Sequence, residues 1–454
     1  MAKDKSLRSS GSQQLPAEFD VQKYNVSFQT GFMLPDPLKS LPAYFEPWNE
    51  LANSLPDLVR EKTFRDAVAK LPLLDHNQLE GHHELRLAHL QLSLITAGYV
   101  WQNGDKGVVK VLPKNVAVPF FNISSQLGIK PILSHLSLAL ANWSLIDPNG
   151  NLECLYHLPG GAPADWFCIV TFMVEFGFSK CLQCTVRIVE LLSSLEAGVT
   201  EHEEETETEI SQCLQDVSKA LKVMQDSLAR MRDNLEAKVF FNVIRPFLSG
   251  WGGETNPLPD GLIYEGISDT PVKLTGGSAA QSATLQVADA LLGVKHVQDK
   301  REFLVKMREF MLPEHGDLIE YIENMPYSLR DFVMSSSREA VKTSYNQAVS
   351  ALTELRDYHL KIVKMYVVLP AKKANEGNYE YLDTTGTGGT NLLPFLKDIW
   401  LDTKERMLAD GRNGSSVSNW HNSAAQLAAY VALNAAFVVV ILFSIKTLAQ
   451  RLNN

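Results

Sequence analysis

The chain has 454 residues, of which 45% are hydrophobic and 21% are charged, and both values are ordinary for a globular protein. A chain of this length can bury a large core and form two domains. The net charge of -10 and the lack of a Lys/Arg-rich stretch argue against nucleic acid as a partner. Five cysteines make a sparse and odd set, which indicates a reducing cytosolic compartment rather than a disulfide framework.

Helical periodicity dominates the first part of the chain. Residues 1–19 contain no apolar segment of the kind that a secretory signal requires, so we expect a disordered lead. Apolar residues recur at helical spacing within residues 48–69, and residues 84–101 are almost free of charge, which predicts a helix buried on most sides. The turn-rich segment 149–163 marks a boundary, and a small helical domain is predicted over residues 20–158.

A larger helical domain is predicted over residues 159–410. It begins with a long apolar helix at 166–195. The acidic run at 201–209 is interpreted as a solvated loop and helix start rather than a metal site. Cys181 and Cys184 form a CxxC pair, but no second pair accompanies them, so we expect a structural role rather than a zinc site.

The most informative helix is predicted over residues 338–369. Its apolar residues are spaced by three and four, and His359 falls on the same seam, facing the core. A buried imidazole must be hydrogen-bonded or bind a metal, and the spacing alone favours the hydrogen bond. Pro370 is predicted to end the helix.

Three other segments bear on ligand binding. The Gly-rich stretches 275–282 and 385–390 lack the Gly-Lys-Ser/Thr ending of a phosphate-binding loop, and taken alone they indicate loops. Arg245 is the one charged residue in the apolar run 239–251. A buried arginine needs an anionic partner, and the sequence leaves open whether that partner is a ligand or an acidic side chain of the protein.

The segment 427–445 carries no charge and is long enough to span the roughly 30 Å hydrocarbon core of a membrane. A buried core helix is the alternative. The preceding residues 411–423 have the composition of a linker. We therefore expect a C-terminal transmembrane anchor at 424–446, which would hold the chain on the cytosolic face of the mitochondrial outer membrane or the endoplasmic reticulum.

Two segments in the C-terminal half carry most of a resemblance to a known family. They are LRDYHLKIVKMYVVLPA at 355–371 and TGTGGTNLLPFLK at 385–397. Together with six others, they resemble the indoleamine 2,3-dioxygenase family, in order over about residues 20–410. The other six are GFMLPDPL at 31–38, AGYVW at 97–101, VLPKNVAVP at 111–119, ANWSLIDPN at 141–149, VFFNVIRPFLSGW at 239–251 and TGGSAAQSATLQVADALLG at 275–293.

The resemblance implies an all-α fold in which a small N-terminal domain lies over a larger domain that holds haem b. It also implies a reaction, the insertion of O₂ across the indole C2–C3 bond of L-tryptophan to give N-formylkynurenine. A neutral histidine ligand leaves ferrous haem able to bind O₂ on its open face. We expect a monomer whose partners are L-tryptophan or a related indoleamine, O₂ and a membrane.

By the same resemblance, His359 is the iron ligand and Arg245 pairs with the substrate carboxylate beside Phe240. Thr387 belongs to a loop that closes over the substrate ammonium, and Arg356 lies near the haem propionates. The remaining matching positions are Phe167 and Thr171 in the pocket, Ser278 and Ala279 beside the haem, Gly276 and Gly277 in the adjoining turn, and Asp289 in structural support.

The chain departs from the family pattern at three positions. His135 stands where many members have a tyrosine, Leu138 stands at a cysteine position, and Ala280 replaces a glycine. If His135 faces the substrate, it should hold an indole less well than tyrosine does and should make activity depend on pH. The alternative is that His135 points away and bonds a neighbouring backbone group.

Two other functions fit the same sequence. One is a haem protein that stores or senses O₂ without catalysis, since some molluscan myoglobins share this fold. The other is a membrane-tethered adaptor that has lost activity. Arg245 favours the enzyme, because an oxygen carrier needs no group to bind a carboxylate.

Overall fold

The computed structural model describes residues 19–147, 150–198, 203–374, 386–387 and 391–409. The described residues up to Met407 belong to one compact unit. The predicted linker at 411–423 and membrane helix at 424–446 lie outside the described residues, as does nearly all of the predicted lead. The domain boundary expected near residue 158 stays a prediction.

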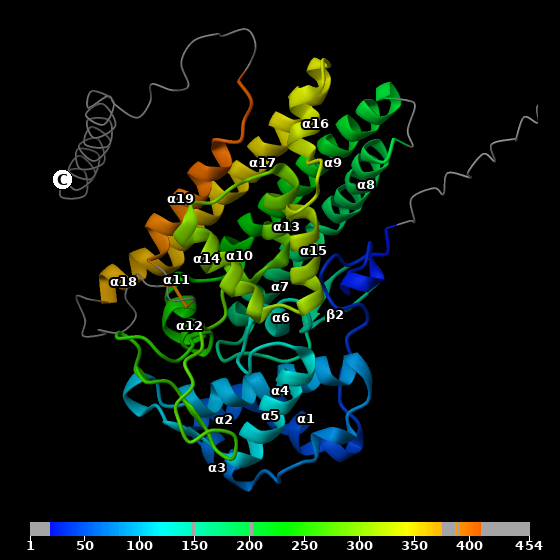
Figure 1. Ribbon diagram of the computed structural model, residues 1–454. Coiled ribbons are helices and arrows are strands. Elements are labelled where there is room, and N and C mark those ends of the chain that lie inside the picture. Colours follow the sequence, from blue (N-terminus) through cyan, green and yellow to red (C-terminus); the bar gives the residue numbers. More distant parts are fainter. Residues whose placement is uncertain (1–18, 148–149, 199–202, 375–385, 388–390, 410–454) are drawn as a thin grey trace, which may run out of the picture. The chain divides into compact units, whose positions relative to one another are not determined.

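The helical fold predicted from the sequence is confirmed (Figure 1). The described strands form two small sheets, in which β1 pairs with β4 in parallel and β2 pairs with β3 antiparallel. The helices of the first third are α1 (Glu46–Asn53), α2 (Leu55–Glu61), α3 (Phe64–Lys70), α4 (Gly81–Trp101), α5 (Lys114–Leu127) and α6 (His135–Leu138). The strands are β1 (Val111–Leu112), β2 (Trp143–Leu145), β3 (Leu152–Cys154) and β4 (Ile263–Tyr264).

The remaining α-helices build the part that holds the cavity described below. They are α7 (Ala162–Gly177), α8 (Ser179–Glu196), α9 (Glu203–Ala229), α10 (Met231–Asn234), α11 (Ala237–Val239), α12 (Arg245–Phe247), α13 (Ala283–Leu292), α14 (Gln298–Met307), α15 (Pro313–Glu323), α16 (Leu329–Ser335), α17 (Glu339–Val363), α18 (Leu369–Ala374) and α19 (Leu392–Lys404). Two π-helical turns are η5 (Phe240–Ile244) and η8 (Lys364–Val368), and the 3-10 helices are η1 (Gln22–Tyr24), η2 (Ala43–Phe45), η3 (His76–Gln78), η4 (Asp105–Gly107), η6 (Ala279–Gln281) and η7 (Arg308–Phe310).

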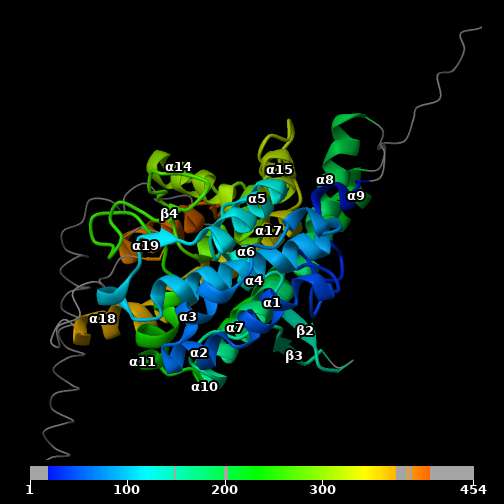
Figure 2. The same ribbon diagram turned by 90° about the horizontal axis from the view of Figure 1, so that it is seen from below.

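Helix α4 is the central helix of the N-terminal group, which Figure 2 shows from below. Nearly all of its side chains from Arg86 onward are buried, as its lack of charge predicted. Gly98 explains how closely its neighbours approach. A Cβ atom there would lie 2.4 Å from Leu55 Cδ1 and 2.8 Å from Phe64 Cε1, so a larger residue would force these two buried side chains to move.

Four long helices, α7, α8, α9 and α17, pack together in the rest of the unit (Figure 1). The continuous helical stretch Ala162–Glu196 is long and apolar enough to cross a membrane by length and composition alone. It is, however, divided at Phe178 into α7 and α8, and both helices pack on α9. Core packing therefore accounts for its apolar character.

Helix α17 has the buried stripe that the sequence predicted, including Tyr345, Leu352 and Leu355. The predicted end at Pro370 is wrong. The chain passes through η8, in which the Leu369 amide donates to the Lys364 carbonyl, and continues as α18 with Pro370 in its first turn. The wider π-helical turn leaves room for the proline ring, which would clash in a regular α-helix.

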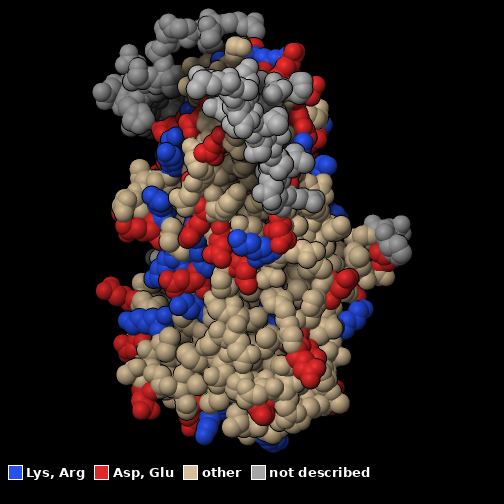
Figure 3. Space-filling view, turned by 45° about the vertical axis from the view of Figure 1, so that its right-hand side comes forward, with Lys and Arg blue, Asp and Glu red and all other residues tan. Residues whose placement is uncertain are grey.

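On the face shown in Figure 3, Lys and Arg side chains alternate with Asp and Glu side chains. Several exposed pairs of this kind are close ion pairs, such as Arg60 with Asp57 at 2.7 Å and Arg187 with Glu209 at 2.6 Å. Pairs at the surface stabilise a fold by at most about 1 kcal/mol each, so the buried groups matter more.

Candidate active site

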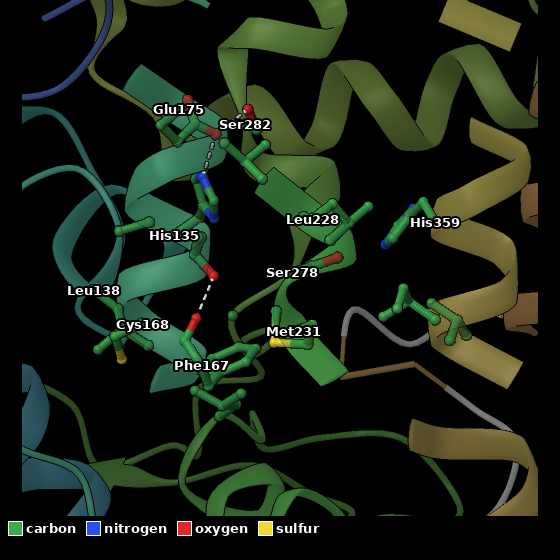
Figure 4. A pocket seen from close by; sticks show the side chains of 18 of the residues that line it. His135, Leu138, Phe167, Cys168, Glu175, Leu228, Met231, Ser278, Ser282 and His359 are labelled. Carbon is green, nitrogen blue, oxygen red and sulfur yellow. Dashed lines mark hydrogen bonds and ion pairs between the residues drawn. The ribbon is translucent and has the colours of Figure 1, made fainter. Parts of the chain in front are cut away.

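A largely apolar cavity lies among α6, α7, α9, η5 and α17, with about 1290 Å³ of empty space including its open part. In Figure 4, His359 points from α17 towards Ser278 and Leu228, while His135 and Phe167 lie on the opposite side. Nine of the residues predicted from the sequence line this one cavity: His135, Phe167, Thr171, Phe240, Gly277, Ser278, Ala279, Arg356 and His359.

The imidazole of His359 is partly buried and makes no hydrogen bond with any residue that the structure describes. Burial, and then the positive charge of Arg356, lowers the pKa of His359 to about 4. The ring is therefore neutral at physiological pH, which is the form that binds a metal ion. A neutral imidazole with an unused nitrogen, on the wall of an apolar cavity, fits haem iron.

A buried ionic network holds the helix turn that precedes His359. Arg356 donates to Asp289 on α13 at 2.6 Å and also to Thr403 on α19. His296 contacts Asp289 at 3.1 Å and Asp402 at 2.9 Å. Burial alone would raise the pKa of Asp289, but Arg356 and His296 outweigh burial and hold it below its usual value. Arg356 thus has a protein anion as partner, and α17 is fixed to α13 and α19.

Two aromatic side chains line the cavity from α7 and η5. The rings of Phe167 on α7 and Phe240 on η5 have centroids 5.2 Å apart, and Phe240 also meets Tyr366 of η8 at 5.8 Å. The two π-helical turns therefore face each other across their aromatic residues. The Thr171 hydroxyl donates to the Phe167 carbonyl at 2.9 Å, so this hydrogen bond stays within the helix.

The loop beside Ser278 depends on close contact between two backbone segments. A Cβ atom on Gly250 would lie 2.2 Å from the Leu274 carbonyl oxygen, and one on Gly276 would lie 2.2 Å from the Leu248 carbonyl oxygen. Glycine is therefore required at both positions. Ser278 caps the short helix η6, where its hydroxyl accepts from the Ala280 amide at 3.3 Å.

Sequence reasoning did not single out Glu175, which lines the same cavity from α7. Its carboxylate accepts hydrogen bonds from the Ser282 and Thr284 hydroxyls at 2.7 Å and 2.6 Å. His135 Nε2 lies 2.8 Å from the same carboxylate. The alternative in which the His135 ring points away from the cavity and bonds a backbone group is therefore wrong, because the ring lines the cavity and bonds a carboxylate. Glu175 is the one charged residue in the apolar run 166–178, and this was the feature of the sequence that could have indicated a buried polar site.

Arg245 and Thr387 line a second, more polar cavity, with about 1370 Å³ of empty space including its open part. The Arg245 guanidinium is buried and lies over the Phe241 ring, 5.2 Å from its centroid. Burial raises the pKa of Asp105, and the Arg245 charge partly opposes that rise, so an acidic side chain lies near this arginine. Both alternatives for the arginine's partner therefore stay open.

The two cavities share one wall. Phe240 and Leu248 line the first cavity, whereas Arg245 and Ser249, from the same segment, line the second. Thr387 is attached to this wall, because its carbonyl accepts from the Gly276 amide at 3.0 Å and its hydroxyl donates to the Gly277 carbonyl. The residues that the sequence grouped into one site are thus distributed over two adjoining spaces.

Comparison with known proteins agrees with this geometry. The indoleamine 2,3-dioxygenase family model matches residues 20–406. The chain is 40% identical to human indoleamine 2,3-dioxygenase 2 over 86% of this chain and 95% of that protein. It is 39% identical to indoleamine 2,3-dioxygenase 1 of Rattus norvegicus, over 88% of this chain and 99% of the relative. It is also 42% identical to a myoglobin of Haliotis madaka, over 86% of this chain and 99% of the relative. The chain belongs to the indoleamine 2,3-dioxygenase family.

Proposed function

We propose that the protein is a haem-dependent dioxygenase that inserts both atoms of O₂ across the indole C2–C3 bond of L-tryptophan, giving N-formylkynurenine. The observation that carries the proposal is the neutral imidazole of His359, which lies on the wall of an apolar cavity and has no hydrogen-bond partner in the described part of the chain, in a protein of this family. When haem is bound, it supplies the oxygen chemistry, and the chain supplies binding and orientation.

Each wall of the cavity has a distinct task in this proposal. His359 holds the haem iron, and the network around Arg356 and Asp289 keeps the helix turn before His359 in place. Phe167 and Phe240 offer aromatic faces against which an indole ring can pack, because aromatic rings attract one another beyond simple area burial. The apolar lining excludes water from the reacting groups.

The amino-acid end of the substrate is assigned to the adjoining polar cavity. Arg245 is proposed to bind the carboxylate, and Thr387 belongs to the loop proposed to close over the ammonium group. This assignment is supported by the resemblance of the motifs and by the position of both residues beside the wall that carries Phe240 and Gly277.

The direct test is turnover. Purified, reduced, haem-loaded protein should convert L-tryptophan to N-formylkynurenine, detected by its absorbance and by mass spectrometry. Protein with a full haem complement that forms no product would contradict the proposal.

Oxygen binding without catalysis is a second candidate, because two relatives at 41–42% identity are named myoglobins. Reversible O₂ binding with no product from L-tryptophan would favour that function. If the purified chain retains no haem, the adaptor function is favoured instead.

The hydrophobic run at 427–445 supports a further proposal, that residues 424–446 anchor the enzyme to an intracellular membrane. The full chain and a 1–423 form should then separate on fractionation of carbonate-washed lysates, with only the full chain in the membrane pellet. Equal solubility of both forms would contradict an anchor.

A further inference from the structure

One polar cluster stands out on the wall of the first cavity. It consists of Glu175 on α7, His135 on α6, and Ser282 and Thr284 at the start of α13. The side chains of Glu175 and His135 are only 4% and 10% exposed. Helix α6 and the start of α13 thus direct polar groups at one carboxylate of α7, in surroundings that are otherwise largely apolar.

The carboxylate of Glu175 is charged. Burial by itself would raise the pKa of Glu175, but the hydrogen bond and the charge of His135, together with the hydrogen bonds from Thr284 and Ser282, outweigh burial and lower it. A buried charge without such partners would be strongly unfavourable. With both hydroxyls donating to it, Glu175 takes the acceptor role in this cluster, and an ionised carboxylate can only accept hydrogen bonds.

This charge decides which nitrogen of His135 carries the proton. Because Glu175 accepts at 2.8 Å, the Nε2 atom of His135 must donate. In the neutral ring, Nδ1 is then an acceptor with a lone pair. Nδ1 has no hydrogen-bond partner among the residues that the structure describes, and the ring lines the cavity. The amide of His135 donates to Gln281 at 3.0 Å, which also fixes the start of α6.

We propose that Glu175 is a positioning residue for substrate recognition, which orients His135 so that Nδ1 accepts a hydrogen bond from the N–H group of a bound indole. The inference rests on the proposed function for the identity of the substrate. It gives the pocket a preference for aromatic ligands that carry an N–H donor, in addition to their shape. The assignment of Nε2 as the donor and Nδ1 as the acceptor does not depend on whether the protein turns over a substrate.

The first test compares two ligands that differ at one atom. L-Tryptophan and 3-(3-benzothienyl)-L-alanine have nearly the same shape, but sulfur replaces the N–H group in the second. Equilibrium binding to the haem-loaded wild type should favour tryptophan by about tenfold, since an unfilled buried acceptor is costly. Equal affinity for the two ligands would overturn the proposal.

A double-mutant cycle shows whether Glu175 acts through His135. In Glu175→Gln the preference for tryptophan should fall by about threefold or more, because the NH2 end of the amide can donate to the ring, so that Nε2 is no longer fixed as the donor. In His135→Phe the preference should vanish, and adding Glu175→Gln to it should change nothing further. Glu209→Gln, at an exposed ion pair outside the cavity, should keep the wild-type preference. An equal effect of Glu175→Gln with and without His135 would overturn the proposal.

The protonation of His135 gives a readout that needs neither turnover nor a variant of Glu175. In ¹⁵N-histidine-labelled, ferrous, carbon-monoxide-bound protein, the signal assigned by its loss in His135→Phe should show Nε2–H and an unprotonated Nδ1. A ring protonated on both nitrogens, or on Nδ1 alone, would overturn the proposal. If the wild type shows the expected tautomer and ligand preference but forms no product from L-tryptophan, the proposed catalysis fails and this inference stands.

Discussion

The two adjoining cavities differ in where they keep their charges. The charged side chains that line the first cavity, Arg356 and Glu175, are buried and are each paired with other groups of the protein, and the surface is mainly apolar. In the second cavity, Arg245, Lys273 and Lys306 line the space itself. The first is suited to a flat, apolar ring system and the second to an ionic group. The segment 240–249 supplies residues to both cavities, so one short motif contributes to two chemically different surfaces.

Removing the histidine of the first cavity should have the largest effect. His359→Ala takes away the imidazole proposed as iron ligand, and we expect the protein to lose most of its haem and all of its activity. Haem content per chain, measured by the pyridine haemochrome method, is the readout. His83→Ala, at an exposed histidine, is the control. If the His359→Ala protein has a normal haem content and an unchanged histidine-ligand spectrum, His359 is not the iron ligand.

The buried ion pair at the first cavity should matter for stability. Asp289→Asn leaves the buried guanidinium of Arg356 without its anionic partner, with both side chains 8% exposed. Breaking a buried pair in this way costs about 3–5 kcal/mol, so the free energy of unfolding should fall by that amount. Chemical denaturation checks it, with Asp57→Asn at an exposed pair as a control that should change stability by less than about 1 kcal/mol. Equal effects of the two substitutions would show that the network does not stabilise the wall.

Acid should destabilise the fold through two buried histidines outside the cavity. His89 on α4 bonds Ser137 on α6 at 2.7 Å, and burial lowers the pKa of His89 to about 4 and that of His315 to about 3. Below about pH 6.5 the unfolded chain binds protons that the folded chain does not, so stability present above pH 6.5 is lost as pH falls towards 4. For His89 the loss amounts to about 3 kcal/mol. Thermal unfolding from pH 7 to 4.5 should show a steadily falling midpoint, and a constant midpoint would contradict these protonation states.

The second cavity is tested by its arginine. Arg245→Ala should reduce kcat/KM for tryptophan by about 30- to 900-fold, which corresponds to roughly 2–4 kcal/mol for a lost charged hydrogen-bond partner. Lys306→Ala, at an exposed residue of the same cavity, should change it far less. The haem content of both variants should be normal. Unchanged turnover in Arg245→Ala would mean that the arginine pairs within the protein, and Asp105 is the acidic side chain shown to lie near it.

Much of this arrangement could be predicted from the sequence, because helical spacing carries strong information. The seam of α17 put His359 on a core-facing side, and the uncharged run of α4 indicated burial. The π-helical turns at Phe240–Ile244 and Lys364–Val368 could not be predicted, since such turns are rare and both lie in mostly apolar runs, where the spacing of apolar residues does not show the shift. Those turns also account for the wrong end at Pro370 and for the way Phe240 and Arg245 reach different cavities.

Glu175 was missed for a related reason. In sequence it is one charge among apolar residues, and its partners His135, Ser282 and Thr284 lie 40 to 109 positions away along the chain. Tertiary packing alone brings them together, so no local pattern could have shown that the carboxylate is satisfied. The departure at His135 was visible, but its consequence depended on a residue that the sequence did not associate with it.

The smallest expected effect concerns His135→Tyr, which separates the shape of the first cavity from its hydrogen bonding. A tyrosine ring should pack against an indole better than imidazole does, by about 0.5–1.5 kcal/mol, or two- to tenfold in affinity. The same change removes the Nδ1 acceptor, which opposes that gain when the ligand has an N–H group. Binding of 3-(3-benzothienyl)-L-alanine, which has no N–H group, should therefore tighten by two- to tenfold, while binding of L-tryptophan should tighten less or not at all.

Equilibrium titration of both ligands into both proteins measures the difference. An equal gain for the two ligands would mean that His135 contributes through its shape alone, and no gain for either would mean that an indole does not pack against this side of the cavity.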